Sequence, residues 1–203
     1  ENEFYKAEFS TLGGTVTQLS YLGEKGRQAF TKTDFFSGDS RESGSFGVSF
    51  LHEKADLKEA IFKMIRRSES IEFSYELPGE YQLVKTYVLR ADKAAMDLVV
   101  RIKNLSPREK NFPVTLNYGM DHQKDYQKNY GYYDAVAYTD KLQSKGLAHI
   151  KKKGFSFPEG TRWGGLIKKY FALLVKPGGK ISEGRARADE KHLWEEITLE
   201  PLA

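Results

Sequence analysis

The chain has 203 residues, of which 39% are hydrophobic and 30% are charged, a balance typical of a folded globular protein. The absence of cysteine excludes a disulfide framework, a thiolate metal site and a cysteine nucleophile. Its 32 basic and 28 acidic residues are mostly interspersed and leave a formal charge of +4, so the composition predicts no nucleic-acid partner.

Period-two alternation of apolar and polar residues predicts a protein made of many short strands. Gly13 and Gly14 separate the first two expected strands, because glycine accepts the positive φ angles of a tight turn. Segments 71–77 and 96–102 alternate clearly and predict half-buried strands, and 81–89 is rich in β-forming residues and follows a Pro-Gly-Glu turn. Further strands are expected at 4–9, 15–22, 46–51, 112–120, 132–138, 170–175 and 193–199.

One segment conflicts with this pattern, because four apolar residues recur at helical spacing after Asp56, a residue type that caps helices. Against a helix, 61–66 is short, partly β-branched and close to a clear strand, so we predict a strand there. The Gly/Ser-rich stretch 37–45 and the polar stretch 104–111 are expected to be loops. The whole pattern predicts a mostly antiparallel β protein, folded as one domain over residues 1–203.

The start of the sequence and its apolar runs bear on targeting and membrane insertion. Glu1 begins the chain without a charged start, an apolar stretch or a small-residue cleavage site, so we expect a leader or anchor to be absent or already removed. No apolar run approaches the roughly 18 residues that a membrane-spanning helix needs. We therefore expect the chain as given to span no membrane.

Three stretches occur in a recognisable order and spacing. The first, 9–19, turns through two glycines into a strand that carries Val and Leu. The second, 84–104, joins a Lys-Thr-Tyr-Val-Leu run through a short turn to a strand that ends in Asn, and the third, 163–177, places a Trp before a Lys-Tyr-Phe-Ala core. Together they cover about a quarter of the chain and resemble the large periplasmic domain of the YidC family of membrane protein insertases.

This resemblance implies a fold and a set of signature residues. The fold is an all-β, antiparallel β-supersandwich similar to galactose mutarotase-like proteins, with little helix. The signature residues that match the family's stretches are Gly13, Gly14, Trp163, Tyr170 and Phe171. If Trp163 and Phe171 are fully buried anchors between sheets, replacing either with alanine should cost about 3 to 5 kcal/mol of folding free energy.

The resemblance also implies a location and a role. The chain would be a domain on the periplasmic side of the bacterial inner membrane, tethered between a first transmembrane helix and a later bundle of helices. The groove that accepts membrane segments in such insertases lies outside this chain, so the resemblance implies a non-catalytic scaffold or protein-interaction module in membrane protein insertion. Its implied partners are the parent transmembrane region, translocon components and nascent membrane proteins.

Two departures from the family pattern accompany the resemblance. The sequence stops at Ala203, where the family's domain continues through more strand and a helix, so we expect the sandwich to be truncated at its C-terminal end. The stretch 37–53 is also shorter than in larger family members. No partner surface of the family is therefore carried over to that stretch.

The residues themselves offer little support for catalysis. A mutarotase-like fold raises a carbohydrate-binding or mutarotase-like alternative, which needs a histidine and a carboxylate converging on a sugar. Asp121, His122 and Asp125 place a histidine among acidic neighbours, and we expect His122 to be a surface or turn residue. No glycine-rich phosphate loop and no set of three or four metal ligands occurs in sequence, so we expect no enzyme, no cofactor and no metal.

Two clusters are candidates for surface contacts. Tyrosines 126, 130, 132 and 133 are interleaved with lysines and combine apolar rings with hydroxyl groups. At Tyr126, Tyr130, Tyr132 and Tyr133 we expect protein contact ahead of sugar binding, and nucleic-acid stacking last, with core strand positions as the alternative for half of them. The run 151–153 of three lysines fits either anionic lipid headgroups, at about 1 kcal/mol for each lysine, or a solvated turn.

Overall fold

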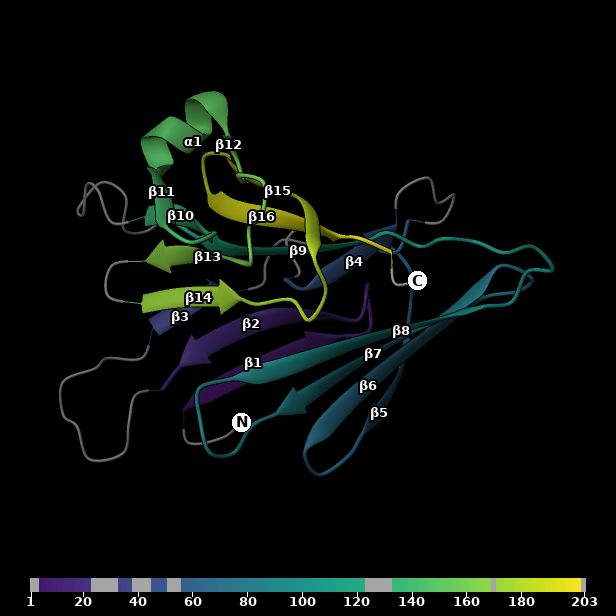
Figure 1. Ribbon diagram of the computed structural model, residues 1–203. Helices are drawn as coiled ribbons and strands as arrows, with labels where there is room; N and C mark the ends of the chain where they lie inside the picture. The colour runs from purple at the N-terminus through teal and green to yellow at the C-terminus, as the bar shows by residue number, and fades with distance from the viewer. Residues whose placement is uncertain are drawn as a thin grey trace. The chain divides into compact units, whose positions relative to one another are not determined.

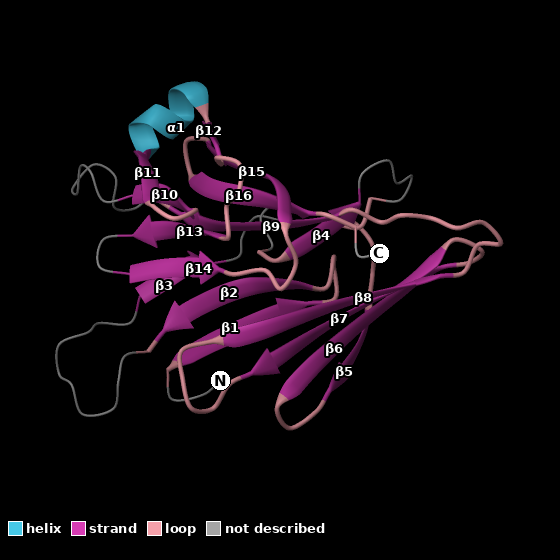
Figure 2. Ribbon diagram, in the orientation of Figure 1, coloured by secondary structure: helices cyan, strands magenta, loops and turns pink. Residues whose placement is uncertain are grey.

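The computed structural model describes residues 4–22, 33–37, 45–50, 56–122, 133–168 and 171–201. Throughout these residues strands predominate, and the seven-residue α1 (Leu147–Lys153) is the one α-helix among them (Figure 2). The prediction of an all-β, antiparallel sandwich protein with little helix is confirmed. The chain forms two compact units, unit 1 with residues 1–47 and 53–112 and unit 2 with residues 48–52 and 113–203. A single domain over 1–203 stays a prediction.

Unit 1 contains two antiparallel sheets (Figure 1). The first has the order β1-β2-β3 and is made of β1 (Tyr5–Ser10), β2 (Thr15–Tyr21) and β3 (Thr33–Ser37). The second is a meander in the order β5-β6-β7-β8, made of β5 (Lys63–Arg66), β6 (Ser70–Leu77), β7 (Tyr81–Leu89) and β8 (Met96–Asn104). Short turns join its strands in sequence, as the alternation of the sequence predicts.

Aromatic side chains hold the two sheets of unit 1 face to face. Phe73 on β6 and Tyr87 on β7 are fully buried and meet in a T-shaped contact with ring centroids 5.9 Å apart. Phe9 on β1 contacts both rings, with centroid distances of 6.1 Å to Phe73 and 5.1 Å to Tyr87. Such aromatic pairs contribute beyond their buried area, so the core of this unit lies between β1 and the β6–β7 hairpin.

Unit 2 also contains two antiparallel sheets. The four-stranded sheet has the order β11-β10-β13-β14, with β10 (Tyr133–Tyr138), β11 (Leu142–Gly146), β13 (Trp163–Lys168) and β14 (Phe171–Val175). The five-stranded sheet has the order β12-β15-β16-β9-β4, with β4 (Gly47–Phe50), β9 (Val114–Asp121), β12 (Phe155–Ser156), β15 (Ile181–Ala188) and β16 (His192–Leu199).

Glycines allow the two sheets of unit 2 to close around one aromatic ring. A Cβ atom on Gly164 of β13 would come within 2.7 Å of the Phe157 ring, and a Cβ atom on Gly184 of β15 would overlap the same ring. Both glycines therefore leave the space that Phe157 fills. The ring packs between strands of the two different sheets.

The described strands correct the sequence predictions in several places. The helical alternative after Asp56 is wrong, because residues 57–59 form a turn and β5 follows at Lys63. The sequence pattern also gave no expectation of β3, β11, β12, β13, β15 or α1. Helix α1 escapes a periodicity argument because seven residues are fewer than the 11 to 18 needed to judge a helical repeat.

Candidate functional site

The most unusual side chain of unit 1 is Lys85, a charged residue at the centre of β7 with 0% of its surface exposed. Its Nζ donates hydrogen bonds to the carbonyl oxygens of Gly13 (3.2 Å), Gly14 (2.6 Å) and Phe46 (2.7 Å). These three residues all have positive φ angles, of 66°, 54° and 63°. An ammonium group has three N–H donors, so the three carbonyls use its full donor capacity.

Tyr87 completes this buried cluster. Its hydroxyl donates to the carbonyl oxygen of Gly14 at 2.9 Å, and its ring centroid lies 5.6 Å from the Lys85 Nζ. Burial lowers the pKa of Lys85 to about 7 and raises the pKa of Tyr87 far above its usual range. Because its donors are used within the fold, Lys85 clamps the β1–β2 turn and residue 46 onto the second sheet and has no donor left for a ligand.

Unit 2 buries a second titratable pair. Glu195 on β16 is 0% exposed, and the hydroxyl of Tyr118 on β9 donates a hydrogen bond to its Oε2. Burial raises the pKa of Glu195 to about 8, while hydrogen bonds from Tyr118 and from the backbone of Val136 act in the opposite direction. Burial and the neighbouring Glu195 raise the pKa of Tyr118 as well. At neutral pH the carboxyl group is therefore mostly protonated.

Two histidines meet two carboxylates where β9 and β16 lie side by side. The His192 ring lies between them, with Nδ1 at 3.3 Å from Asp189 Oδ2 and Nε2 at 3.7 Å from Asp121 Oδ1. Nε2 of His122 lies 3.1 Å from the carbonyl oxygen of Asp189, and its ring forms a T-shaped contact with Tyr133. Burial lowers the pKa of His122. Of the expected surface or turn position, the surface position is wrong, since His122 is 1% exposed; the residue lies directly after the end of β9.

Asp189, a member of this histidine cluster, closes the β15–β16 turn through its carboxylate. Asp189 Oδ1 accepts the backbone N–H groups of Lys191 and His192, each at 2.7 Å. Partial burial acts to raise the pKa of Asp189, but these hydrogen bonds outweigh it and lower the pKa. Over the described part of the chain, no three His, Asp or Glu side chains are placed to hold a metal ion. The carboxylate is committed to the turn, as an Asx-type turn requires.

The candidate tyrosine surface is only partly described. Tyr133 begins β10 and is 4% exposed, so its ring lies in the core, with the Lys168 Nζ at 6.0 Å from its centroid. Tyr126, Tyr130 and Tyr132 lie outside the described residues. A contact surface at those three positions stays a prediction.

The signature residues that the structure describes lie partly in a turn and partly in half-buried strand positions. Gly13 and Gly14 form the expected β1–β2 turn, and both have positive φ. Trp163 begins β13 and stacks on Tyr138 of β10, with centroids 5.2 Å apart and planes 9° apart, while Tyr170 lies outside the described residues. Trp163 and Phe171 are only half-buried. The cost of about 3 to 5 kcal/mol expected for full burial therefore does not apply to either residue.

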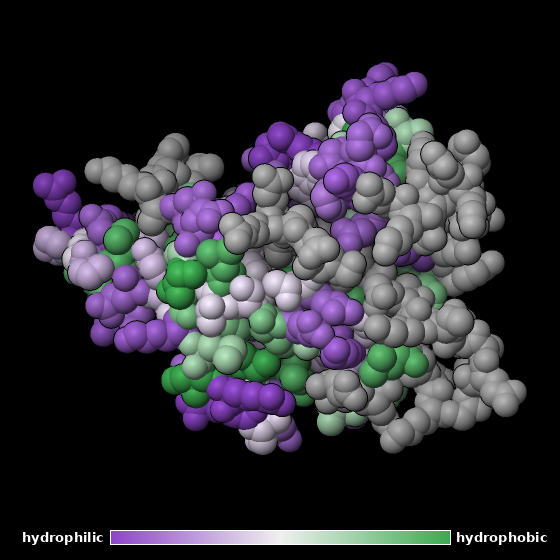
Figure 3. Space-filling view, turned by 180° about the vertical axis from the view of Figure 1, so that it is seen from behind, coloured by the Kyte–Doolittle hydropathy of each residue, from purple (hydrophilic) through white to green (hydrophobic). Residues whose placement is uncertain are grey.

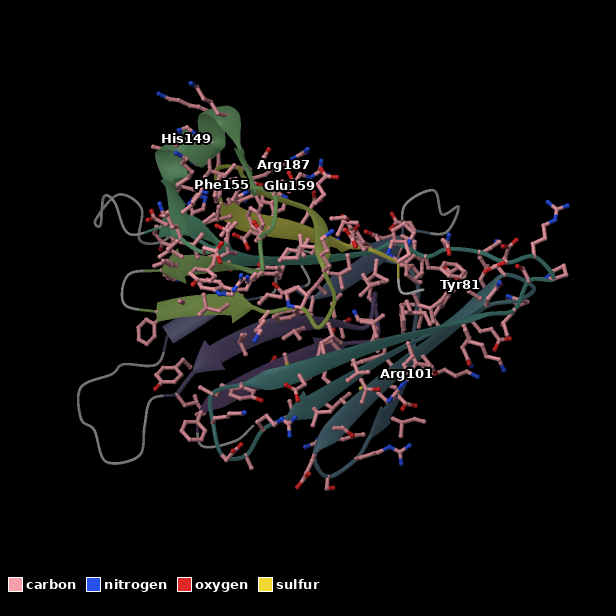
Figure 4. All side chains as sticks on the ribbon, viewed as in Figure 1. Tyr81, Arg101, His149, Phe155, Glu159 and Arg187 are labelled. Atoms are coloured by element: carbon pink, nitrogen blue, oxygen red, sulfur yellow. The ribbon has the colours of Figure 1, made fainter. Side chains whose placement is uncertain are left out.

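The three lysines 151–153 form the last turn of α1, where cations complement the helix dipole, and not an irregular turn. Lys151 pairs with Glu190 at 3.2 Å, and Lys152 and Lys153 are exposed. Their neighbour His149 lies on the same helix (Figure 4). This arrangement explains the lysines structurally and leaves a lipid contact as a prediction.

The sequence reasoning missed Lys85 and Glu195, although a signal was present. Lys85 has Leu83 and Tyr87 two residues away on either side, and Glu195 has Leu193 and Ile197. Period-two alternation places all of these on the buried face of a strand. A charged residue at an apolar position of a strand therefore marks a buried polar centre.

Sequence comparison gives one informative similarity. The chain is 24% identical over 191 residues to the membrane protein insertase YidC of Syntrophus aciditrophicus (strain SB). The chain is similar to an insertase. The matched region is 87% of this chain but 35% of the relative, so the chain spans about a third of the length of the curated relative that it matches. No family model matches the chain.

The described residues contain no helix that could cross a membrane. At seven residues, α1 falls short of the length and apolar character that a membrane-crossing helix requires, and the described residues contain no other α-helix.

Proposed function

We propose that this chain is the extracytoplasmic domain of a YidC-type membrane protein insertase and acts there as a non-catalytic scaffold and protein-interaction module. The supporting observation is the similarity to YidC along 87% of the chain. It agrees with the three ordered stretches of the sequence, which lie far apart along the chain. In this proposal the domain belongs to a bacterial inner-membrane protein and lies on the periplasmic side.

The geometry of the buried groups supports a scaffold role. Among the described residues, Lys85 and Glu195 are the buried ionisable groups with the largest changes in pKa toward neutrality, a property often found in active sites. Lys85 instead holds backbone carbonyls, and Glu195 holds Tyr118. The polar groups of both side chains therefore form hydrogen bonds within the fold that join its elements.

The first test is the gene beyond both ends of this chain. We expect one hydrophobic span encoded before Glu1 and several after Ala203, because the proposed parent protein is anchored on both sides. A secretion signal before Glu1 and a stop codon after Ala203 would contradict the proposal.

The second test addresses the role. In cells depleted of their own insertase, the full-length gene should restore insertion of a single-span test protein. Glu195→Gln and Lys85→Arg, which keep hydrogen-bonding groups, should leave that restoration intact in any variant that folds. A specific loss of insertion with unchanged folding would contradict a purely structural role for these groups, and sugar-dependent shifts in the NMR spectrum of the chain would favour a carbohydrate-binding domain instead.

A further inference from the structure

Among the described residues of unit 1, most of the exposed large hydrophobic residues lie in β5 or directly before it. Its four residues are all exposed. Ile61, Met64 and Ile65 expose 67%, 51% and 48% of their surfaces, and they are three of the six large hydrophobic residues that are exposed among the described residues. Hydrophobic side chains reach the surface next to strongly hydrophilic ones in the space-filling view (Figure 3). Side chains alternate along a strand, so Met64 and Ile65 point to opposite faces of the sheet, and exposed apolar side chains lie on both faces of this edge.

The backbone of β5 is open on one side. β5 is the first strand in the order β5-β6-β7-β8, and along Lys63–Arg66 no described strand pairs with its other side (Figure 1). Directly before β5 that side is occupied, because the Phe62 N–H donates to the carbonyl oxygen of Thr11 at 2.8 Å and Ile61 bridges Leu12. Arg67 N–H donates to the carbonyl oxygen of Ser70 at 2.8 Å, and the antiparallel register continues with Ile65 opposite Glu72. Hydrogen-bonded pairs alternate along such a ladder. The N–H and C=O groups of Met64 therefore point away from β6, toward the open side, and so do those of Arg66.

The charges beside this edge select between occupants. Lys63, Arg66 and Arg67 are exposed and form no ion pair with any described residue. A second copy of the chain would bring the same three cations to the edge, so pairing between copies is opposed by repulsion. An acidic segment would be attracted. The apolar residues and the cations together fit an extended segment that carries both apolar and acidic side chains.

We propose that β5 binds an extended, unfolded polypeptide segment of alternating apolar and acidic residues, which adds to the sheet as a further antiparallel strand. Main-chain hydrogen bonds to Met64 and Arg66 hold the segment, and the exposed apolar and cationic side chains select it. This inference rests on the proposed function, in which the segment belongs to an exported stretch of a membrane protein under assembly.

The probe is a labelled ten-residue peptide that alternates valine and glutamate, titrated with the chain and followed by fluorescence anisotropy. Met64→Pro removes an N–H group that points to the open side and leaves the hydrogen bonds of β5 to β6 in place. We expect this variant to bind the peptide at least about tenfold more weakly. The matched control Met64→Leu keeps the N–H group and the apolar side chain, and should bind within about twofold of the wild type. Equal binding by the wild type and a folded Met64→Pro would overturn the proposal.

Two further comparisons keep the proposal testable if Met64→Pro does not fold. A peptide N-methylated at alternate residues lacks half of its donors and should lose binding to the unchanged protein. Ile65→Asp should weaken binding, whereas Val99→Asp on β8, the other outer strand of the same sheet, should not. Equal effects of the two substitutions, or equal binding of the methylated peptide, would overturn it.

Two further observations distinguish the other outcomes: the effect of reversing the charge of the peptide, and the sequence of the gene on both sides of this chain. A peptide with lysine in place of glutamate should bind at least about tenfold more weakly. Concentration-dependent pairing of the chain without peptide binding would replace the proposed occupant with a second copy and overturn the inference. If the peptide fails to bind but the gene encodes hydrophobic spans on both sides of the chain, only this inference is overturned. If the gene encodes no such spans, the proposed function is overturned, whatever the result with the peptide.

Discussion

Lys85 and Glu195 place ionisable groups in the interiors of the two units. An ionised group buried without hydrogen bonds would be strongly unfavourable, whereas one that is fully bonded can be held at modest net cost. Lys85 meets this requirement with three carbonyl oxygens, and Glu195 reduces its charge by taking up a proton. Burial also lowers the pKa of Lys85 to about 7, so both groups are shifted toward their neutral forms, and Lys85 in addition has three acceptors for its donors.

Glu195 should make the stability of the chain depend on pH. Between about pH 4.5 and pH 8 the folded chain keeps a proton on Glu195 that the unfolded chain has released. Its stabilising contribution is therefore complete below pH 4.5, and the free energy of unfolding falls as the pH rises, by roughly 1.4 kcal/mol for each pH unit in this window. Glu195→Gln should remove this dependence, which urea unfolding at a series of pH values measures.

The comparison between wild type and Glu195→Gln also controls for other groups. Above about pH 7, Lys85 acts in the opposite direction, because its folded pKa lies below the unfolded value and the folded chain has released the proton first. Both proteins contain Lys85, so its contribution cancels in the difference between them. A difference in unfolding free energy that stays constant from pH 5 to pH 8 would contradict the role assigned to Glu195.

Only part of these two centres could be predicted from sequence. The alternation of β7 places Lys85 on the buried face, because Tyr81, Leu83 and Tyr87 share its parity. Its acceptors could not be predicted, since Gly13, Gly14 and Phe46 lie 72, 71 and 39 residues away along the chain. A local pattern identifies a buried position but not the distant backbone that meets it.

At the scale of elements, the β1–β2 turn depends on glycine for two separate reasons. Gly14 has a φ of +54°, and a Cβ atom there would lie 3.0 Å from the Cβ of Phe73. Gly79, in the β6–β7 turn, has a φ of +74° but no atom within 4 Å of such a Cβ. The two positions share backbone strain and differ in packing.

We expect Gly79→Ala to cost about 1 kcal/mol of folding free energy, from the positive φ alone. Gly14→Ala should cost about 1 to 3 kcal/mol more, because it also forces Phe73 to move in the core. Thermal or denaturant unfolding of both variants measures the difference. Equal costs at the two turns would show that the contact with Phe73 relaxes freely.

Glycines also explain why the sequence pattern did not predict some of the strands. β7 was predicted with the observed bounds, because its β-forming residues are uninterrupted. β13 contains Gly164 and Gly165, and β15 contains Gly184, which weaken the β propensity that a sequence pattern relies on. These glycines make room for Phe157 and for Leu174, contacts that appear only after folding. Packing needs outweighed local preference in these strands.

At the scale of the whole molecule, neither unit is one continuous stretch of chain. β4 supplies an outer strand to the five-stranded sheet of unit 2, although it precedes most of unit 1 in sequence. A fragment of residues 113–203 lacks β4 and leaves that side of β9 uncovered. We expect this fragment to unfold at lower denaturant concentration than unit 2 does in the whole chain, and to self-associate.

Restoring the missing strand is the control for this prediction. Residues 45–50 joined by a flexible linker to the fragment should recover part of the lost stability. A scrambled version of the same six residues should not. Equal unfolding of the fragment with and without the native strand, measured by intrinsic fluorescence, would mean that β4 contributes little to unit 2.

The place of β4 in the sequence also fixes an order of assembly. The β5 to β8 meander is built from neighbouring hairpins and can form as soon as residue 104 has been synthesised. β4 cannot pair until β9 has been synthesised, and residues 51–113 separate the two strands in the sequence. While the chain is being synthesised, β4 therefore lacks its partner strand until β9 has been made, and its backbone groups on that side stay open to other chains during this interval.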